Sequence, residues 1–370
     1  MTRAIGVISG TSMDGIDVAL LDGDGEIIAQ VGTGASYPYP PEVAQRLREV
    51  IADPVLAAGP LEALERDVTD AHVAAVETFL AEHAIPRDSV ALVGLHGQTV
   101  LHRPQARFTR QLCDGARAAD RLRLDVVCDF RSADVAAGGE GAPLVPLYHA
   151  AIAAGLERPL MFLNWGGVGN VTYLGASGEI VAFDTGPANA LLDDFLRRRL
   201  GLSHDENGAL AAQGRVRDDL VSAWMQDSYF RRAAPKSLDR NHFHALTAAT
   251  EELSNADGAA TLAAFTIEAT AAALRLVHEA PQRWLVCGGG RRNATLMAAL
   301  ARRLGVTVEP IEAIGQDGDF VEAACFAHLA LRSRRGLPLS LPSTTGAPAP
   351  LTGGVVWRKP QKKAPSKRGQ

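Results

Sequence analysis

A turn rich in glycine, hydroxyl and carboxylate groups, GTSMDGID, follows directly on the first apolar run of the chain. Glycine lets the backbone approach a ligand closely, and successive N–H groups in such a turn form a concavity that binds anions. The hydroxyl groups add hydrogen bonds to phosphate, and the carboxylates suit a cation or an ordered water. We expect this turn to bind a phosphorylated cofactor through Gly10, Thr11, Ser12, Met13, Asp14, Gly15, Ile16 and Asp17.

Two well-known catalytic motifs are excluded for this turn. No lysine follows its glycines, and no G-x-x-x-x-G-K-[ST] segment occurs in the chain, so it is not a Walker A loop. Ser12 lacks the glycine two residues later that a nucleophile elbow requires. Considered alone, the turn fits an ordinary hairpin better, so its assignment depends on a partner elsewhere in the chain.

A second turn of small residues, GGVGN, occupies a matching position further along. The segment VALLDGDGEIIA, Val18–Ala29, aligns without gaps on VTYLGASGEIVA, Val171–Ala182, at an offset of 153 residues. Two unrelated β-meanders that share a common hairpin pattern would also give this match. We favour a duplicated fold, because each copy follows an apolar strand and a small-residue turn. Paired turns can hold phosphates from two sides, and in the second turn we expect this of Gly166, Gly167 and Asn170.

Two further strand ends in the second half carry residues suited to chemistry. CGGGRRN follows the run WLVC and precedes a helix, so it favours a phosphorylated ligand over a plain strand-to-helix turn. FDTGPANA places Asp184 directly after a strand, where a general base can reach a nucleophile. Helix capping is the alternative for Asp184, although Asn189 is better placed to cap that helix. The ligand residues expected in CGGGRRN are Gly288, Gly289, Gly290 and Asn293.

Loops in the first half carry groups that hydrogen-bond sugars and carboxylates. Gln98 in HGQT offers an amide, and Arg131 in DFRSADV offers the planar fork that matches a carboxylate. His96 is more typical of a packed strand end, and Glu140 fits a loop and a ligand contact equally. Glu322 begins a helix with apolar residues on two faces, so a substrate or magnesium contact competes with a favourable helix-dipole interaction.

The composition is that of an ordinary globular protein of about two domains. The chain has 370 residues, 47% of them hydrophobic, and a net charge of −5. Basic residues gather only in the tail from Trp357, so no nucleic-acid partner is expected. The N-terminus lacks a signal peptide, and no uncharged apolar run approaches the ~18 residues of a membrane helix, so we expect a cytoplasmic protein with no membrane partner. Four dispersed cysteines without a CxxC pair indicate neither disulfides nor a zinc site.

Strand-like and helical patterns alternate along the chain, which predicts an α/β protein with mixed sheets flanked by helices. The expected helices lie at or near Pro41–Ala52, Gly59–Ala84, Gly115–Arg121, Leu144–Gly155, Ala190–Leu200, Thr261–Glu279, Ala294–Leu304 and Phe320–Arg335. The expected strands are Ile5–Ile8, Val18–Leu21, Glu26–Val31, Val90–Leu95, Asp125–Cys128, Leu160–Leu163, Val171–Leu174, Ile180–Phe183 and Trp284–Cys287. The Pro-, Ser- and Gly-rich segment Leu337–Gly354 is expected to be loop.

Taken in chain order, these motifs resemble the anhydro-N-acetylmuramic acid kinases. The matching segments run from about Ile5 to about Gly354 and are GTSMDGID, HGQT, DFR, GGEGAPLVP, LNWGGVGN, FDTGPAN, APKS, CGGGRRN and the EAACFAHLALR helix. That family belongs to the superfamily of sugar kinases, Hsp70 and actin. The resemblance implies two ribonuclease-H-like domains with mixed sheets and an interdomain ATP cleft. We place the domains at residues 1–156 and 157–336, followed by a C-terminal loop segment at 337–356 and a disordered basic tail at 357–370.

The resemblance also implies a reaction. Asp184 would deprotonate a water that attacks the anomeric carbon of 1,6-anhydro-N-acetylmuramic acid, while the departing O6 takes the γ-phosphoryl group of ATP. The products are N-acetylmuramic acid 6-phosphate and ADP, in murein recycling. Mg²⁺ would bridge the phosphates beside Ser12 and Asp14, with no metal site made by protein alone. Gln98, Arg131 and Glu322 match family positions near the sugar, Arg131 as the partner of the lactyl carboxylate, and a homodimer is the implied assembly.

Three segments depart from the family pattern. LNIGGIAN is LNWGGVGN here, and DTGPGN is DTGPAN; both keep small residues where the backbone must come close, so activity is expected to survive. PKSTGRE is PKSLDRN, which changes the loop Lys236–Asn241, and the sequence assigns that loop no role. Two alternative functions remain, a catalytically silent nucleotide- and sugar-binding sensor and a sugar kinase acting on a free hydroxyl. Asp184 argues against the sensor, because binding alone needs no base.

Overall fold

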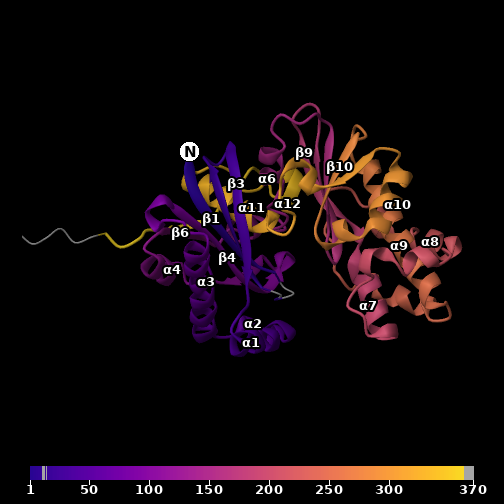
Figure 1. Cartoon of the computed structure of the whole chain (residues 1–370), viewed down its shortest axis with the longest axis horizontal. Coiled ribbons are helices and arrows are strands. Elements are labelled where there is room, and N and C mark those ends of the chain that lie inside the picture. The colour runs from indigo at the N-terminus through magenta and orange to yellow at the C-terminus, as the bar shows by residue number, and fades with distance from the viewer. Residues whose placement is uncertain (11–12, 14, 362–370) are drawn as a thin grey trace, which may run out of the picture. The chain divides into compact units, whose positions relative to one another are not determined.

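The chain forms two compact units (Figure 1). The computed structural model describes residues 1–10, 13 and 15–361. Unit 1 comprises Met1–Ala151, Glu322–Pro342 and the chain from Ala347 onward, and unit 2 comprises Ile152–Val321 and Ser343–Gly346. Unit 1 is therefore assembled from three separate stretches of sequence.

Unit 1 contains a seven-stranded mixed sheet of order β12-β6-β4-β1-β2-β3, with β5 paired to β4. Strands β1, β4 and β6 are parallel, whereas β1, β2 and β3 form an antiparallel meander. The strands are Thr2–Ser9 (β1), Ile16–Gly23 (β2), Ile28–Tyr37 (β3), Leu92–Arg103 (β4), Phe108–Leu112 (β5), Asp125–Cys128 (β6) and Val355–Trp357 (β12).

Helices cover both faces of this sheet. Ile5 and Val7 of β1 share a hydrophobic core with residues of α1, α3 and α4. Gly6 lies between them and points to the opposite face, where a Cβ atom would lie 1.8 Å from the carbonyl oxygen of Ala323 in α11. The helices of this unit are Pro41–Ala52 (α1), Pro54–Ala58 (α2), Glu62–Glu82 (α3), Gly115–Leu122 (α4), Ser132–Ala137 (α5), Pro146–Ile152 (α6) and Val321–Arg334 (α11).

Unit 2 contains a five-stranded mixed sheet of order β11-β10-β7-β8-β9. Its strands are Leu160–Trp165 (β7), Val168–Leu174 (β8), Ile180–Pro187 (β9), Arg283–Cys287 (β10) and Thr307–Pro310 (β11). Its helices are Asn189–Leu200 (α7), Asp218–Trp224 (α8), Asn255–Ala271 (α9) and Ala294–Leu304 (α10), and the short α12 spans Pro342–Thr345. Aromatic side chains from these helices, including Phe195, Trp224 and Phe265, fill the core beside Trp165 and Trp284 of the sheet.

The two sheets repeat one topology, which confirms the duplication predicted from the sequence echo. In unit 1 the order β6-β4-β1-β2-β3 combines a parallel set with an antiparallel meander. In unit 2 the order β11-β10-β7-β8-β9 does the same. The matched segments Val18–Ala29 and Val171–Ala182 span the second and third strands of the two meanders. The expected fold of two related α/β halves with mixed sheets is therefore correct.

Helix α9 and the 3₁₀ turn after it form an apolar stretch, Asn255–Leu276, that by length and composition alone could cross a membrane. Within that stretch, 67% of the most apolar window is buried inside the protein. Phe265 and Ala269 of α9 are completely buried in the unit 2 core. Burial of this kind is typical of the central helix of a globular domain.

The C-terminal part of the chain differs from the expected loop and disordered tail. Val355–Trp357 forms strand β12, which pairs antiparallel with β6 at the edge of the unit 1 sheet. A Cβ atom at Gly115 would lie 2.3 Å from the Trp357 ring, so the indole packs directly on that glycine. Arg358 forms an ion pair with Asp125 at 2.7 Å. Sequence composition hid this strand because it is short and followed by basic residues; residues 362–370 lie outside the described chain.

The expected boundary of the second domain at residue 336 is wrong, because it includes helix α11. Almost all of it belongs to unit 1, although it follows the unit 2 strands in the chain. The physical reason is its fit to glycines in the unit 1 sheet: a Cβ atom at Gly94 would lie 2.1 Å from the carbonyl oxygen of Phe326. The backbone of α11 therefore lies directly against β1 and β4.

Candidate active site

One row of residues across the unit 2 sheet joins three of the predicted segments. In the strand register Cys287 of β10 pairs with Asn164 of β7, Asn164 pairs with Asn170 of β8, and Asn170 pairs with Asp184 of β9. Neighbouring strands lie about 4.8 Å apart. The triple-glycine segment, the second small-residue turn and the expected base therefore share one edge of the sheet.

The second turn, at Gly166 and Gly167, is held by the start of helix α7. The backbone N–H of Asn189 donates to the Gly166 carbonyl at 3.0 Å, and that of Ala188 donates to the Gly167 carbonyl at 3.1 Å. The Asn189 side chain donates to the carbonyl of Trp165 at 2.8 Å. The sequence predicted that Asn189 caps α7, but its side chain does not cap the helix. It instead joins the start of the helix to the turn.

The three glycines after β10 have different roles. Gly288 has a φ of +70°, and a Cβ atom there would lie 2.3 Å from Oδ1 of Asn164. A Cβ atom at Gly290 would lie 2.5 Å from Cβ of Trp165. A Cβ atom at Gly289 would meet nothing within 4 Å. Two glycines are therefore required by packing, and Gly289 leaves an open face.

A cavity of about 420 Å³ adjoins this open face. Gly289, Gly290 and Asn293 line one part of it, and Asn189 and Asp193 contribute to another. Asn293 caps helix α10, since its side chain accepts a hydrogen bond from the Leu296 N–H at 3.0 Å. Desolvation raises the pKa of Asp193 to about 6. The cavity therefore combines a helix N-terminus, exposed backbone and an acceptor group.

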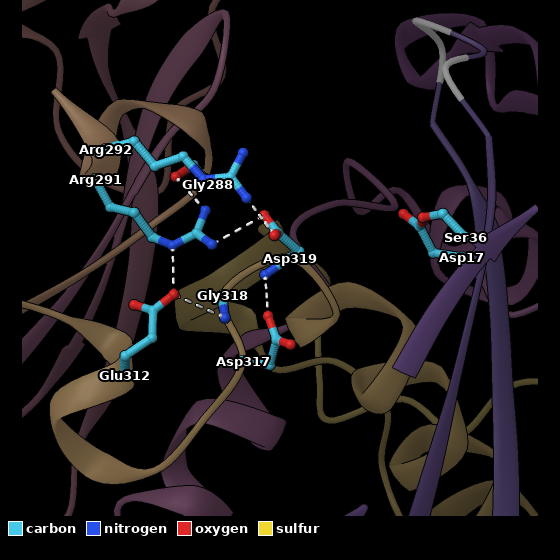
Figure 2. Close-up of polar contacts among 9 residues, drawn as sticks. All are labelled: Asp17, Ser36, Gly288, Arg291, Arg292, Glu312, Asp317, Gly318 and Asp319. Atoms are coloured by element: carbon cyan, nitrogen blue, oxygen red, sulfur yellow. Dashed lines mark hydrogen bonds and ion pairs between the residues drawn. The ribbon is translucent and has the colours of Figure 1, made fainter. Parts of the chain in front are cut away.

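An ion-pair network anchors the segment that follows the triple glycine (Figure 2). Arg291 has a side chain only 5% exposed, and it pairs with Glu312 at 2.8 Å and Asp319 at 2.9 Å. It also donates to the Gly288 carbonyl at 3.0 Å. Arg292 makes a second ion pair with Asp319. These contacts fix the loop that lines the cavity, and the sequence did not distinguish the two arginines from ordinary surface residues.

Asp184 is held by contacts on both its backbone and its side chain. Its N–H donates to the Lys236 carbonyl at 2.9 Å, and its Oδ2 accepts from the Leu238 N–H at 2.8 Å. The Tyr229 hydroxyl donates to the Asp184 carbonyl at 2.5 Å. Asp184 lies within β9 rather than just after it, and it does not cap α7. The carboxylate is thus oriented by the backbone of a neighbouring loop.

Only part of the first turn in unit 1 is described. Thr11, Ser12 and Asp14 lie outside the described residues. The Met13 N–H donates to the Gly10 carbonyl at 3.1 Å, which closes a turn. Asp17, near the start of β2, accepts a hydrogen bond from Ser36 of the neighbouring strand β3 (Figure 2).

Two residues expected to contact ligand in unit 1 are buried instead. The side chain of Ile16 is completely buried in the core, so only its backbone can face a ligand. Gln98 is also completely buried. Its Oε1 accepts from the Ser9 hydroxyl at 2.7 Å, and its Nε2 donates to the Gly10 carbonyl at 3.2 Å. Gln98 therefore stabilises the start of the first turn through the Gly10 carbonyl. The register of β4 with β1 pairs Gln98 with Ser9 and directs its side chain into the protein interior.

Arg131 is a fixed cation in unit 1. Its Nε donates to Nε2 of His96 at 2.9 Å, and one terminal nitrogen donates to the Gly141 carbonyl at 2.7 Å. The guanidinium also lies 5.9 Å from the centre of the Phe326 ring. His96 accepts from Arg131 through Nε2, so its proton lies on Nδ1, which donates to the Gly97 carbonyl at 2.9 Å. His96, which the sequence left without a role, therefore orients Arg131.

The carboxyl group of Glu322 interacts electrostatically with the Arg131 guanidinium. Glu322 is exposed in the first turn of α11, yet the crowding protein around it raises its pKa by desolvation. The Arg131 charge opposes that shift, and the Asp17 charge adds to it. Burial lowers the pKa of Arg131, whereas Glu322 raises it. Unit 1 thus gathers one arginine and two carboxylates at one end of its sheet.

Glu140, which the sequence left as either loop or ligand contact, accepts a hydrogen bond from the Gln105 side chain at 3.5 Å.

Comparison with known proteins gives matches over almost the whole chain. Among solved structures, a ROK family glucokinase from Streptomyces griseus matches 90% of this chain and 100% of its own at 14% identity, with a TM-score of 0.42. The family model for anhydro-N-acetylmuramic acid kinase matches residues 2–359. Curated kinases of that name are 51% identical in Rhodospirillum rubrum, covering 96% of this chain and 94% of the relative, and 52% identical in Paramagnetospirillum magneticum, covering 95% and 98%.

Proposed function

The chain belongs to the anhydro-N-acetylmuramic acid kinase family, and on that premise we propose that it opens and phosphorylates 1,6-anhydro-N-acetylmuramic acid with ATP in cell-wall recycling. Water adds to C1 of the sugar and loses a proton to Asp184. The bond between C1 and O6 breaks, O6 bonds to the γ-phosphorus, and ADP leaves. The products are N-acetylmuramic acid 6-phosphate and ADP, and every atom of water and ATP is accounted for.

The observation that carries this proposal is the row Cys287, Asn164, Asn170 and Asp184 across the unit 2 sheet. It aligns a carboxylate with two glycine-rich turns at one sheet edge. A general base works best when its position is fixed and its target is held still. The hydrogen bond from Leu238 leaves Asp184 oriented rather than freely rotating. As in an inverting glycosidase, one carboxylate activates water, while phosphoryl transfer captures the leaving oxygen.

The residues around Gly289 fit the nucleotide. Its open face lets a flat or phosphorylated group lie on the backbone. The adjoining cavity, at about 420 Å³, is of the size range of ligand pockets. Helix α10 directs its N-terminus to this region, and a helix N-terminus favours phosphate. We assign Gly288, Gly289, Gly290 and Asn293 to ATP binding, together with Gly166, Gly167 and Asn170.

The first turn fits the requirement for Mg²⁺. Kinases hold this ion mainly through substrate phosphates and one or two carboxylates. Asp17, at the base of the turn, and Asp14, outside the described residues, are the carboxylates that would hold it. Bound Mg²⁺ neutralises charge on the phosphates during transfer. Gln98 contributes by fixing the Gly10 carbonyl of the same turn.

Arg131 and Glu322 are the residues proposed for the sugar. A guanidinium donates strong charge-assisted hydrogen bonds to a carboxylate, so Arg131 suits the lactyl group. His96 and the Gly141 carbonyl occupy its Nε and one terminal nitrogen, which leaves the other terminal nitrogen to the substrate. Glu322 suits the sugar hydroxyl or amide groups as an acceptor.

Substitution of Asp184 tests this function against a sensor that only binds. We expect Asp184→Asn to lower kcat about 10²- to 10⁴-fold, the range for loss of a general base, and to leave ATP affinity nearly unchanged. Asp218→Asn, at an exposed aspartate of unit 2, is the matched control and should keep full activity. Unchanged turnover in Asp184→Asn would exclude it as the base, and no sugar-dependent ADP formation by the wild type would favour the sensor.

We propose a cytoplasmic homodimer as the working form, as the family resemblance implies. Light scattering coupled to size-exclusion chromatography measures the assembly directly. A mass of about twice 39.1 kDa is expected, and a mass near 39.1 kDa would contradict the dimer.

A further inference from the structure

The loop Lys236–Asn241, to which the sequence assigned no role, begins beside Asp184 of β9. The Lys236 carbonyl accepts from the Asp184 N–H at 2.9 Å, and the Leu238 N–H donates to the Asp184 carboxylate at 2.8 Å. Backbone on both sides of Ser237 is therefore bonded to the same aspartate. The loop that departs from the family pattern begins as a clamp on the expected base.

Lys236 places a buried ammonium next to this clamp. The residue is only 7% exposed. Its Nζ donates to the Tyr229 carbonyl at 3.0 Å and lies 4.2 Å from the centre of the Tyr229 ring. The hydroxyl of the same tyrosine donates to the Asp184 carbonyl at 2.5 Å. Tyr229 therefore contacts both the lysine and the backbone of the aspartate.

Titratable and charged groups lie around the Tyr229 ring that Lys236 contacts. Arg232 lies 5.6 Å from the centre of the Tyr229 ring and repels the ammonium. Asp184 attracts it. His242 contacts the Tyr229 ring and is paired with Asp227 at 3.3 Å. Desolvation first, and Arg232 second, lower the pKa of Lys236 to about 8, against the opposing effect of Asp184.

We propose that Lys236 is a positioning residue for Asp184: its buried ammonium keeps the Asp184 carboxylate ionised, while the backbone of residues 236–238 fixes its orientation. A buried cation near a carboxylate stabilises the charged form of that carboxylate. A base must be deprotonated before it can accept a proton, so this charge extends activity to lower pH. The inference rests on the proposed function of Asp184 as the base.

The lysine content of the chain gives a direct probe. Lys236 is the only lysine before Lys359, and the other four lysines all lie between Lys359 and Lys367. In the full chain labelled with ¹³Cε-lysine, NMR titration should therefore show one resonance that titrates near pH 8 and that is missing from Lys236→Met. Asp184→Asn removes the attraction and should lower the pKa of that resonance by about 1 unit.

Activity gives the reciprocal measurement. Lys236→Met removes the positive charge and should raise the pKa of Asp184, which moves the acid limb of kcat/KM for the sugar to higher pH by about 1 unit. Because coupling between two titrating groups is mutual, this shift should equal the NMR shift in Asp184→Asn. Arg232→Met, at an exposed position, removes a repulsion and should raise the pKa of Lys236 instead.

The outcomes separate the two proposals. If the pKa of the Lys236 resonance is the same in Asp184→Asn, Arg232→Met and the wild type, the inference is overturned, even if Lys236→Met fails to fold. A Lys236→Met enzyme with lower kcat but an unmoved acid limb would also overturn it, because that is what a purely structural lysine gives. If the wild type shows no sugar-dependent turnover, the proposed function fails, and the NMR arm still measures the coupling.

Discussion

Arg131, which we propose for the lactyl carboxylate, is held in place by its own neighbours in the protein. His96 accepts from its Nε and Gly141 from a terminal nitrogen, so little side-chain entropy remains to be lost on binding. The neutral state of His96 is enforced as well. Burial lowers its pKa far below the usual value, and the Arg131 charge lowers it further. A protonated His96 could not accept the hydrogen bond that orients Arg131.

Removal of Arg131 should weaken recognition of the lactyl carboxylate. A hydrogen bond to a charged group contributes about 1.5–3 kcal/mol, or roughly 10- to 150-fold. We expect Arg131→Gln to lower kcat/KM for 1,6-anhydro-N-acetylmuramic acid by that factor. For 1,6-anhydro-N-acetylglucosamine, which lacks the lactyl group, the change should be small. Steady-state kinetics with both sugars measure the difference, and equal losses on both would show that Arg131 does not read the carboxylate.

His96→Leu should give a weaker version of the same selective loss. It removes the acceptor that orients Arg131 but keeps the cation. The double variant should be no worse than Arg131→Gln alone, because His96 acts through the arginine. Additive losses in the double variant would contradict this dependence.

At the scale of elements, the contact of α11 with the unit 1 sheet depends on glycines. A Cβ atom at Gly94 would lie 2.1 Å from a carbonyl oxygen of α11. Gly94→Ala should therefore lower the melting temperature, with a loss in free energy of unfolding larger than the ~1–3 kcal/mol typical of overpacking. Gly289→Ala is the control, since its Cβ would meet no atom, and it should keep stability while weakening ATP binding. Calorimetry that shows equal melting temperatures for Gly94→Ala and the wild type would contradict this packing.

The sequence placed Asp184 and the second small-residue turn at strand ends. The register of the unit 2 sheet pairs Asn170 of that turn with Asp184. Helices Pro41–Ala52 and Ala294–Leu304 begin and end at the predicted residues, because proline and asparagine mark their first turns. Strands β5 and β11 were missed, since they are short and largely unburied and show no apolar run. Gln98 was expected in a loop after the strand, whereas β4 extends through it, and its burial depends on pairing with β1. The hydrogen bonds between the loop at Lys236 and Asp184 join residues far apart in sequence, which periodicity does not reveal.

At the scale of the whole molecule, buried histidines should make stability depend on acid. Burial lowers the pKa of His72, His149 and His328 to about 3. The unfolded chain binds protons near pH 6.5, whereas the folded chain does not, so stability falls as pH drops from about 6.5 toward 3. Each such histidine contributes up to about 1.4 kcal/mol per pH unit in that window. Melting temperatures at pH 7.5 and 5.5 should differ accordingly.

His328→Leu should reduce this acid sensitivity. Within the described chain, neither ring nitrogen of His328 has a hydrogen-bond partner, and the residue is completely buried. An apolar side chain of similar size removes a desolvation cost at every pH and a protonation cost at low pH. The variant should therefore melt higher than the wild type at pH 5.5 and differ less at pH 7.5. An equal acid-induced loss in both proteins would exclude His328 as a contributor.

The reaction in ¹⁸O-labelled water tests the central claim most directly. Mass spectrometry of the product, sampled together with ADP formation, should show one ¹⁸O atom at C1 of N-acetylmuramic acid 6-phosphate and none in the phosphate. Product incubated in labelled water without enzyme measures exchange at C1 and should lag far behind. An unlabelled phosphorylated sugar with its anhydro ring intact would contradict ring opening by water and identify a kinase acting on a free hydroxyl.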